Sequence, residues 1–280
     1  MALLDDMLRF IEEDAPFGDI TSASVIPDIP CDAVIRAEQA GIIAGLTEVS
    51  TLFSHFGVAV KHGAKDGDAV CQNDIILSLS GEAKKILLVE RTALNIIGRM
   101  SSIATQTRTM ADIVSSVNPR CRIAATRKTC PGFQIFDKKA VQIGGGDPHR
   151  MNLSDGILIK DNHLALVPLR SAILAAKKVS AYKKIEVEVE TSDDALIAAT
   201  SGADIIMLDN MSPDQVTRTI ALLKRKGLRD RVLIELSGGI NGSSLINYAA
   251  LDVDMISLGL LTHSVCNFSV NLEIIPDSNR

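Results

Sequence analysis

The stretch "IEVEVETSDDALIAATSGADIIMLDN", residues 185–210, decides the fold class of this 280-residue chain. It begins as a short strand of alternating residues, continues as a helical stretch at 193–201, and ends in a second apolar strand, "DIIML", at 204–208. Strand–helix–strand alternation is typical of a parallel sheet, because strands that run in one direction need a crossover connection.

The same alternation extends through the second half of the chain. Further helical stretches are expected at 166–180, 213–226 and 243–250, and the other short apolar runs are "CRIAAT" (121–126), "GILIK" (156–160), "VLIEL" (232–236) and "MISL" (255–258). This segment is much shorter than the roughly 250 residues of a complete eight-unit barrel. We therefore predict an incomplete, TIM-like α/β barrel over residues 111–265.

Residues 1–110 follow a different pattern, which predicts a separate N-terminal domain. The segments 33–45 and 68–83 are expected to form short strands with glycine turns, and apolar residues at helical spacing predict one long helix over 84–117. The alternating tail "NFSVNLEII" (267–275) predicts a further strand. We expect residues 266–280 to return to the first domain.

Composition excludes several classes of function. A net charge of −5, an aromatic content of 3% and the absence of Trp argue against nucleic-acid binding. Apolar runs such as "LALVPL" (164–169) are far shorter than the roughly 18 residues of a membrane span. The five cysteines are scattered without a CxxC pair, which favours reduced thiols over zinc or disulfide frameworks. We expect a cytoplasmic protein that binds neither nucleic acid nor membrane.

Polar or glycine residues follow all of the predicted strands of the second domain. The run 121–126 leads into Arg127 and Lys128, and the next run ends at Lys160. Later runs end at Asp209, at the segment 237–239 and at Gly259. Because the carboxyl ends of barrel strands form the active sites of α/β barrels, this pattern predicts an enzyme site.

The stretch "ATRKTCPGFQIFDKKAVQIGGGDPHR" (125–150) gathers cations in an acidic chain. They are Arg127, Lys128, Lys138, Lys139, His149 and Arg150. Such a concentration of positive charge predicts an anionic ligand. The run Gly144-Gly145-Gly146 is not a Walker loop, because no Lys-Ser/Thr pair follows it.

Strict alternation in "IEVEVE" puts Glu186, Glu188 and Glu190 on one face of a strand. One interpretation is an edge strand with a solvated face. The other is a solvated pocket in which a glutamate meets a cation, a substrate hydroxyl or Mg²⁺, with Asp209 as its partner. Ser237-Gly238-Gly239 could present backbone N–H groups to a phosphate. Cations, carboxylates and glycines together predict a phosphorylated sugar and a second anion as ligands.

Several motifs in fixed order are similar to those of the quinolinate phosphoribosyltransferase family. They are "RKTCPG" (127–132), "KKAVQIGGGDPHR" (138–150), "LIKDNH" (158–163), "EVEVE" (186–190), "LDN" (208–210) and "SGGI" (237–240). The resemblance extends from "EEDAPFGDITS" (12–22) through "ERTALN" (90–95) to "SLGLLTHS" (257–264), which is nearly the whole chain.

The resemblance implies an N-terminal open α/β sandwich domain, a C-terminal partial α/β barrel, and a homodimer whose partner subunit completes each site. It implies the transfer of phosphoribosyl from phosphoribosyl pyrophosphate to quinolinate, with Mg²⁺. The products are nicotinate mononucleotide, pyrophosphate and CO₂, in de novo NAD biosynthesis. Whether dimers assemble further stays open.

Individual residues match the family's functional positions. Arg127, His149, Arg150 and Lys160 match its quinolinate-binding cations, and Arg91 matches the arginine that the neighbouring subunit supplies. Lys128, Glu188 and Asp209 match the catalytic group for phosphoribosyl pyrophosphate and Mg²⁺, and Ser237, Gly238, Gly239 and Gly259 match the 5′-phosphate cradle. One departure is Gln134, where the family commonly has Arg.

Alternatives stay open on the sequence alone. A related protein linked to molybdenum transport shares the "RKT.PG" and "HR" motifs, but this chain keeps "LIKDNH", which that family lacks. A nicotinate-using phosphoribosyltransferase would need fewer cations, because its substrate has one carboxylate. A non-enzymatic nucleotide sensor would not need Lys128, Glu188 and Asp209. Which of the three glutamates dominates is also open.

Overall fold

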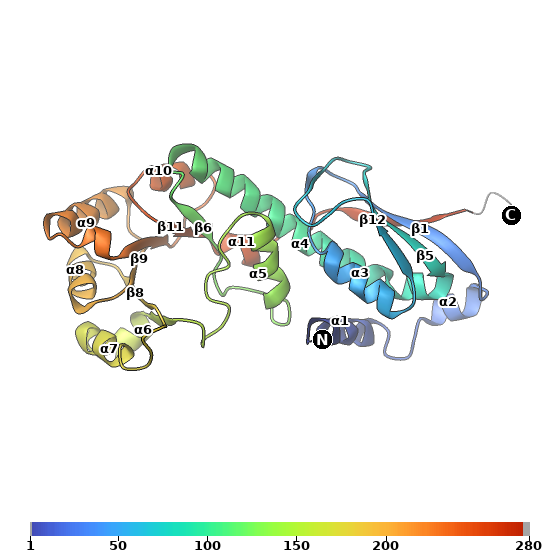
Figure 1. The fold of residues 1–280 in the computed structure, drawn as a ribbon, viewed down its shortest axis with the longest axis horizontal. Helices are drawn as coiled ribbons and strands as arrows, with labels where there is room; N and C mark the ends of the chain where they lie inside the picture. Colours follow the sequence, from blue (N-terminus) through green and yellow to red (C-terminus); the bar gives the residue numbers. More distant parts are fainter. Residues whose placement is uncertain (1, 277–280) are drawn as a thin grey trace. The chain divides into compact units, whose positions relative to one another are not determined.

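The computed structural model describes residues 2–276 and divides into two compact units (Figure 1). One unit contains the chain up to Arg108, Cys130–Gly145 and the chain from Ser264 onward; the other contains Thr109–Thr129 and Gly146–His263. The predicted domains divide the chain at 110/111 and 265/266, and their outermost positions, 1 and 277–280, lie outside the described residues. The main difference is the segment 130–145, which belongs with the first unit.

The first unit is built on an antiparallel sheet with the strand order β12-β1-β5-β3. Its strands are β12 (Val270–Ile275), β1 (Pro30–Ala37), β5 (Ile75–Glu82) and β3 (Ala59–His62), and β2 (Gly41–Ile42) pairs separately with β4 (Ala69–Val70). As the alternation at 267–275 predicts, the tail forms a strand here: β12 pairs with β1 from Asp32↔Ile275 to Ala37↔Val270.

Among the described residues, five helices belong wholly or partly to the first unit. They are α1 (Ala2–Asp14), α2 (Ile20–Val25), α3 (Leu46–His55), α4 (Ala83–Val117) and α5 (Gln134–Ile143). The 35-residue α4 confirms the long helix predicted over 84–117. In the part of the chain that the structure describes, no helix combines the length and the apolar character needed to cross a membrane.

The second unit is a six-stranded parallel sheet with the order β6-β11-β10-β9-β8-β7. Its strands are β6 (Arg122–Ala124), β7 (Ile157–Ile159), β8 (Ile185–Val189), β9 (Ile205–Asp209), β10 (Leu233–Ser237) and β11 (Met255–Ser257). The first strand pairs with the last, whereas the consecutive strands β6 and β7 are the two edges. This is the order of a barrel opened between its first and second strands, so the predicted incomplete α/β barrel is confirmed.

Backbone hydrogen bonds attach the segment before β7 to the edge strand β6. The N–H of Asp147 donates to the carbonyl of Ile123 at 2.8 Å, and the N–H of Ala125 donates to the carbonyl of Asp147 at 2.9 Å. Two residues later, His149 has a left-handed backbone with φ 55°. The basic end of the 125–150 stretch is thus fixed beside one edge of the sheet.

Helices cover one face of the parallel sheet, as Figure 1 shows for α8 and α9 beside β8 and β9. The helices are α6 (Asp161–Leu164), α7 (Leu169–Ala176), α8 (Ser192–Ser201), α9 (Pro213–Arg225), α10 (Leu245–Ala249) and α11 (Leu260–His263), with a 3₁₀ turn, η1 (Arg229–Arg231). Val187, Leu208 and Leu236 belong to one buried apolar cluster with Ile173 of α7 and Val216 of α9.

Local sequence explains where these helices begin. Thr191, two residues after the end of β8, accepts a hydrogen bond from the N–H of Asp194 and so caps α8. Ser212, Pro213 and Gln215 form a capping box with proline at the first helical position of α9. The strands β8 and β9 are therefore each followed within a few residues by a capped helix.

Candidate functional site

The uncovered face of the parallel sheet encloses a cavity of about 480 Å³ near the carboxyl ends of the strands. The predicted site residues that line it are Arg127, Lys128, His149, Arg150, Lys160, Glu188, Asp209, Ser237, Gly238 and Gly239. Segments as far apart in sequence as 127 and 239 therefore meet in one place, as expected for strand ends of a barrel.

Two predicted residues do not line this cavity. Arg91 is exposed on α4 in the first unit. Gly259 lies beside Lys128 but outside the cavity lining. A Cβ atom built on it would be 3.0 Å from His263 and 3.3 Å from the Lys128 side chain. Gln134, the departure from the family pattern, begins α5 in the first unit and is also absent from the lining.

Four lysine and arginine side chains line the cavity, from the segment after β6 and from those before and after β7. The segment carrying Arg127 and Lys128 follows β6 and is held where the hydroxyl of Thr262 donates to the carbonyl of Lys128 at 2.8 Å. Burial and the nearby charge of Arg127 lower the pKa of Arg150. Two guanidinium groups that repel each other in one cavity favour an anionic ligand between or beside them.

The other basic residues of the 125–150 stretch do not contribute to the cavity. Lys138 and Lys139 lie on α5 in the first unit, where Lys139 forms an ion pair with Glu48 at 2.5 Å. Gly144 ends α5 against α4, since a Cβ atom there would lie 2.5 Å from the carbonyl oxygen of Ala104. The expectation that all six cations serve one anion is therefore wrong for these two lysines.

Only one of the three alternating glutamates lines the cavity. Glu188 is half-buried there and forms an ion pair with the ammonium of Lys160. Glu186 is buried below it, and Glu190 is exposed. Because β8 lies between β7 and β9, the edge-strand interpretation is wrong. Asp209 lies at the end of the adjacent strand β9, with the Asn210 amide 2.5 Å from its carboxylate.

The segment after β10 has a backbone suited to an anion. Gly238 and Gly239 have φ angles of 93° and 63°, both in the left-handed region. A Cβ atom on Gly238 would lie 2.2 Å from the side-chain oxygen of Asn210, whereas nothing lies within 4 Å of one on Gly239. Successive left-handed or turn residues expose their N–H groups to one side, which is a recurrent way to bind phosphate.

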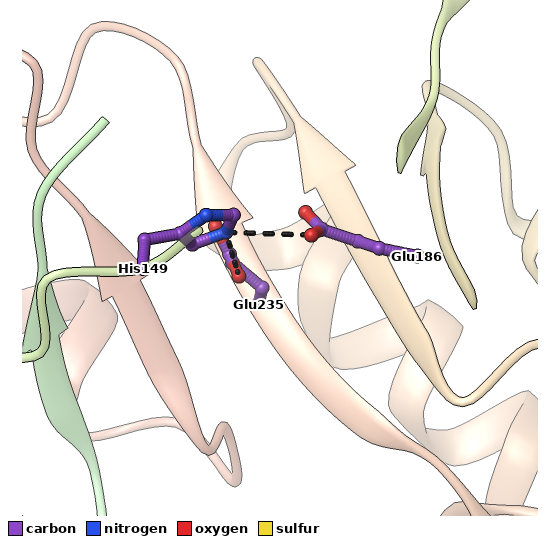
Figure 2. A group of neighbouring side chains, drawn as sticks. All are labelled: His149, Glu186 and Glu235. Atoms are coloured by element: carbon purple, nitrogen blue, oxygen red, sulfur yellow. Dashed lines mark ion pairs between the residues drawn. The ribbon is translucent and has the colours of Figure 1, made fainter. Parts of the chain in front are cut away.

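His149 takes part in a buried charged cluster that the sequence analysis missed (Figure 2). Its Nε2 atom lies 3.3 Å from a carboxylate oxygen of Glu186 and 3.4 Å from one of Glu235, on β8 and β10. Glu235 is fully buried, with 0% of its surface exposed. The available signal was its position in "VLIEL", two residues before Ser237 and therefore on the same strand face.

Protonation in this cluster reflects opposing influences. Burial acts to lower the pKa of His149, but the hydrogen bonds and charges of Glu186 and Glu235 outweigh it and raise the pKa to about 10. The backbone N–H of Arg150, 2.8 Å from Nδ1, favours an unprotonated Nδ1. The single amide N–H affects the ring less than the two nearby carboxylates do, so the pKa of His149 is raised overall. Burial raises the pKa of Glu186, while the hydrogen bond from His149 opposes this shift.

Comparison with known proteins covers nearly the whole chain. Residues 19–101 match the model of the quinolinate phosphoribosyl transferase N-terminal domain, and residues 103–273 match that of the C-terminal domain. A probable carboxylating nicotinate-nucleotide pyrophosphorylase of Archaeoglobus fulgidus is 44% identical over 260 residues, which cover 93% of this chain and 99% of that protein.

More distant relatives agree. The carboxylating nicotinate-nucleotide pyrophosphorylase of Rattus norvegicus is 32% identical over 272 residues, covering 96% of this chain and 90% of that protein. The crystal structure of NadC from Streptococcus pyogenes superposes with a TM-score of 0.89 at 34% identity, covering 97% and 96% of the two chains. The resemblance predicted from the motifs is confirmed: the chain belongs to the quinolinate phosphoribosyltransferase family, the carboxylating nicotinate-nucleotide pyrophosphorylases of NAD biosynthesis.

Proposed function

We propose that the cavity of the second unit transfers phosphoribosyl from phosphoribosyl pyrophosphate to quinolinate and releases pyrophosphate and CO₂, giving nicotinate mononucleotide. The observation that carries this proposal is the content of one cavity. Arginines and lysines from the segments after β6 and before and after β7, the carboxylates of Glu188 and Asp209 from β8 and β9, and the glycine turn after β10 all line it. A dicarboxylate, a ribose and a phosphate need these three kinds of group.

Quinolinate binds among Arg127, Arg150 and Lys160, with His149 in the floor of the same cavity. The planar guanidinium group matches a carboxylate through two parallel hydrogen bonds, which fixes the orientation of the pyridine ring. Burial and the nearby charge of Arg127 lower the pKa of Arg150. A bound dianion relieves the repulsion between the two guanidinium groups. This supports their assignment to the substrate with two carboxylates.

The 5′-phosphate of phosphoribosyl pyrophosphate binds at Ser237, Gly238 and Gly239, with Gly259 behind Lys128. The left-handed backbone at 238 and 239 and the open space beside Gly239 support this assignment. Lys128 is the cation of the cavity that is assigned to the pyrophosphate. With its phosphates held by these residues, the ribose lies near Glu188 and Asp209, which line the same cavity.

Transfer follows from this placement. As pyrophosphate departs, positive charge develops on the ribose, and Glu188 and Asp209 stabilise it. The pyridine nitrogen then bonds to the anomeric carbon, and the adjacent ring carbon loses its carboxylate as CO₂ and gains a proton. Glu188 and Asp209 also fit Mg²⁺, which prefers carboxylate oxygens together with substrate phosphates. Held by these two carboxylates, Mg²⁺ would supply positive charge that offsets the negative charge of the leaving pyrophosphate.

The active form is a homodimer in the cytoplasm, with Arg91 of each subunit completing the cavity of the other. Arg91 is exposed on its own subunit and does not line its own cavity, which supports a role in a partner's site. Phe17 and Ile20 of the same unit are 95% and 75% exposed, as expected for apolar side chains that a partner covers.

All five cysteines are free, which supports a reducing compartment.

The test is a product assay on the purified chain. It is incubated with Mg²⁺, phosphoribosyl pyrophosphate and quinolinate labelled at the 2-carboxylate, and released CO₂ and nicotinate mononucleotide are measured. Equal amounts of both support the proposal. Product from unlabelled nicotinate alone would assign the chain to a nicotinate-using activity. No product from either substrate would favour a molybdenum-linked or ligand-sensing role.

A further inference from the structure

The His149–Glu186–Glu235 cluster separates two cavities in the second unit. Beyond the substrate cavity lies a second one of about 280 Å³, lined by residues at the amino ends of the strands, among them Gly156, Lys184 and Met255. His149 and Glu235 line both cavities, whereas Glu186 lines the second alone. The cluster is therefore the floor of the substrate cavity.

Both glutamates are buried where a carboxylate is costly. Glu186 is 5% exposed and Glu235 is 0% exposed. The hydroxyl of Ser257 donates to one oxygen of Glu235, and His149 faces the other. Among the described residues, Glu186 Oε1 has no hydrogen-bond partner, and Glu235 Oε2 has the ion pair with His149 Nε2 at 3.4 Å. Buried carboxylates persist only where a paired charge compensates for the lost water, and His149 faces both.

The ring of His149 is also coupled to the backbone of its neighbour. Its Nδ1 lies 2.8 Å from the backbone nitrogen of Arg150, so turning the ring would change its contact with the backbone that carries the guanidinium group. His149 has the left-handed φ of 55°, a conformation that a residue with a side chain keeps only when surrounding contacts enforce it. The bond from the N–H of His149 to Asp147 at 2.7 Å and the two carboxylates are such contacts.

We propose that Glu186 and Glu235 are positioning residues of the quinolinate site, which hold the imidazole of His149 and, through it, the adjoining Arg150. Neither glutamate touches substrate in this account. Both act by fixing the floor of the cavity from which the cations face quinolinate. The proposal rests on the proposed function, since it takes quinolinate as the ligand of Arg150.

The experiment uses the full-length chain and the variants Glu186→Gln and Glu235→Gln. The amide keeps the shape of each side chain and removes its charge. The matched control is Glu190→Gln, on the same alternating stretch as Glu186 but exposed and absent from the lining of both cavities. The dissociation constants of quinolinate and of phosphoribosyl pyrophosphate are measured separately by calorimetry, and the imidazole of His149 is followed by NMR.

We expect both variants to bind quinolinate about tenfold more weakly or worse, because small displacements of a binding group have large effects. Binding of phosphoribosyl pyrophosphate should change less than about twofold, which is roughly 0.4 kcal/mol. The His149 ring resonances should titrate at lower pH in both variants and stay unchanged in Glu190→Gln. A loss of folding stability alone would change neither the ratio of the two dissociation constants nor the pH at which the His149 ring titrates.

Ser257→Ala keeps both carboxylates and removes one hydrogen bond, so it tests the cluster if a glutamine variant does not fold. It should weaken quinolinate binding in the same direction by a smaller factor. Unchanged quinolinate binding in folded variants, or equal losses for both substrates, would overturn the proposal. So would a stoichiometric metal ion in the wild-type chain that Glu186→Gln loses. If the wild-type chain binds no quinolinate, the proposed function fails first.

Discussion

The ammonium of Lys160 and the carboxylate of Glu188 form an ion pair at the ends of the neighbouring strands β7 and β8. The pair joins the part of the cavity assigned to quinolinate with the part assigned to the ribose. Lys160 is 41% exposed and Glu188 is 13% exposed, so the charges are only partly withdrawn from water. Each residue thus has a partner within the protein that a substrate must share or replace.

Lys160→Ala should weaken quinolinate binding about tenfold or more and affect phosphoribosyl pyrophosphate binding less. The variant removes a cation from the site assigned to the quinolinate carboxylates. Truncating one partner of a charged hydrogen bond costs roughly 2–5 kcal/mol of binding free energy at a buried contact. The cost is smaller here because Lys160 is partly exposed. Calorimetry with each substrate alone gives the two dissociation constants. Equal losses for both substrates would mean that Lys160 is assigned to the wrong part of the site.

Glu188→Gln should lower kcat by roughly a hundredfold while leaving the quinolinate dissociation constant nearly unchanged. Its carboxylate stabilises charge that develops only during transfer, and losing one such electrostatic contact costs about 10²–10³ in rate. The Mg²⁺ concentration for half-maximal rate should rise in this variant and in Asp209→Asn, and stay at the wild-type value in the exposed control Glu190→Gln. If both Glu188→Gln and Asp209→Asn show the Mg²⁺ dependence of the wild type, these two carboxylates do not hold the metal ion.

Gly238→Ala should abolish binding of phosphoribosyl pyrophosphate and reduce stability. Its Cβ atom would lie 2.2 Å from the side-chain oxygen of Asn210, and its φ of 93° disfavours any side chain. Gly227→Ala is the matched control, since Gly227 also has a positive φ, of 67°, with nothing within 4 Å, and lies outside the cavity. It should cost about 1 kcal/mol of stability and leave binding intact. If the two variants bind alike, the glycine turn is not the phosphate site.

Much of the second unit was predictable because its strands follow simple rules. In "IEVEVE" the period of two predicts both a strand and a polar face, and the six short runs recur as β6 to β11 within a few residues. The resemblance to the family's motifs predicts which of these polar residues lie together in the site, which periodicity alone cannot do. The geometry then agrees, since Arg127, Lys160 and Gly239 all line one cavity although they belong to different strand ends.

The errors arose where an element was not recognised between charged residues. The sequence pattern predicts no helix over 134–143 and therefore groups Lys138 and Lys139 with Arg127 and Arg150. In α5, Asp137 instead pairs with Arg99 at 2.7 Å and Lys139 with Glu48. Nearness in sequence does not give side-chain direction when a helix intervenes. Glu235 was missed because its partner, His149, lies 86 positions away and only the tertiary structure brings them together.

The charge of His149 should make stability depend on alkaline pH. The folded pKa of about 10 lies above the ordinary value of 6.5, so its stabilising contribution is complete below about pH 6.5 and is lost as pH rises through 10. The charged groups that face the ring are Glu186 and Glu235. Urea unfolding of the wild type and of His149→Asn from pH 6.5 to 10 should show a difference in unfolding free energy that shrinks with pH. A constant or growing difference would contradict the raised pKa.

Arg91→Ala and Arg150→Ala should each be inactive alone but partly active when mixed. In a hybrid dimer, one cavity has its own Arg150 and receives Arg91 from the other subunit, while the second cavity lacks both. Random exchange of equal amounts makes half of the dimers hybrid, so recovery should reach about a quarter of wild-type activity. Subunit exchange is verified with differently tagged chains. The control replaces Arg91→Ala with Arg120→Ala, because Arg120 is exposed and lies outside the cavity. This control variant should be active without mixing. If the inactive pair exchanges subunits and recovers nothing, each cavity is complete within one chain.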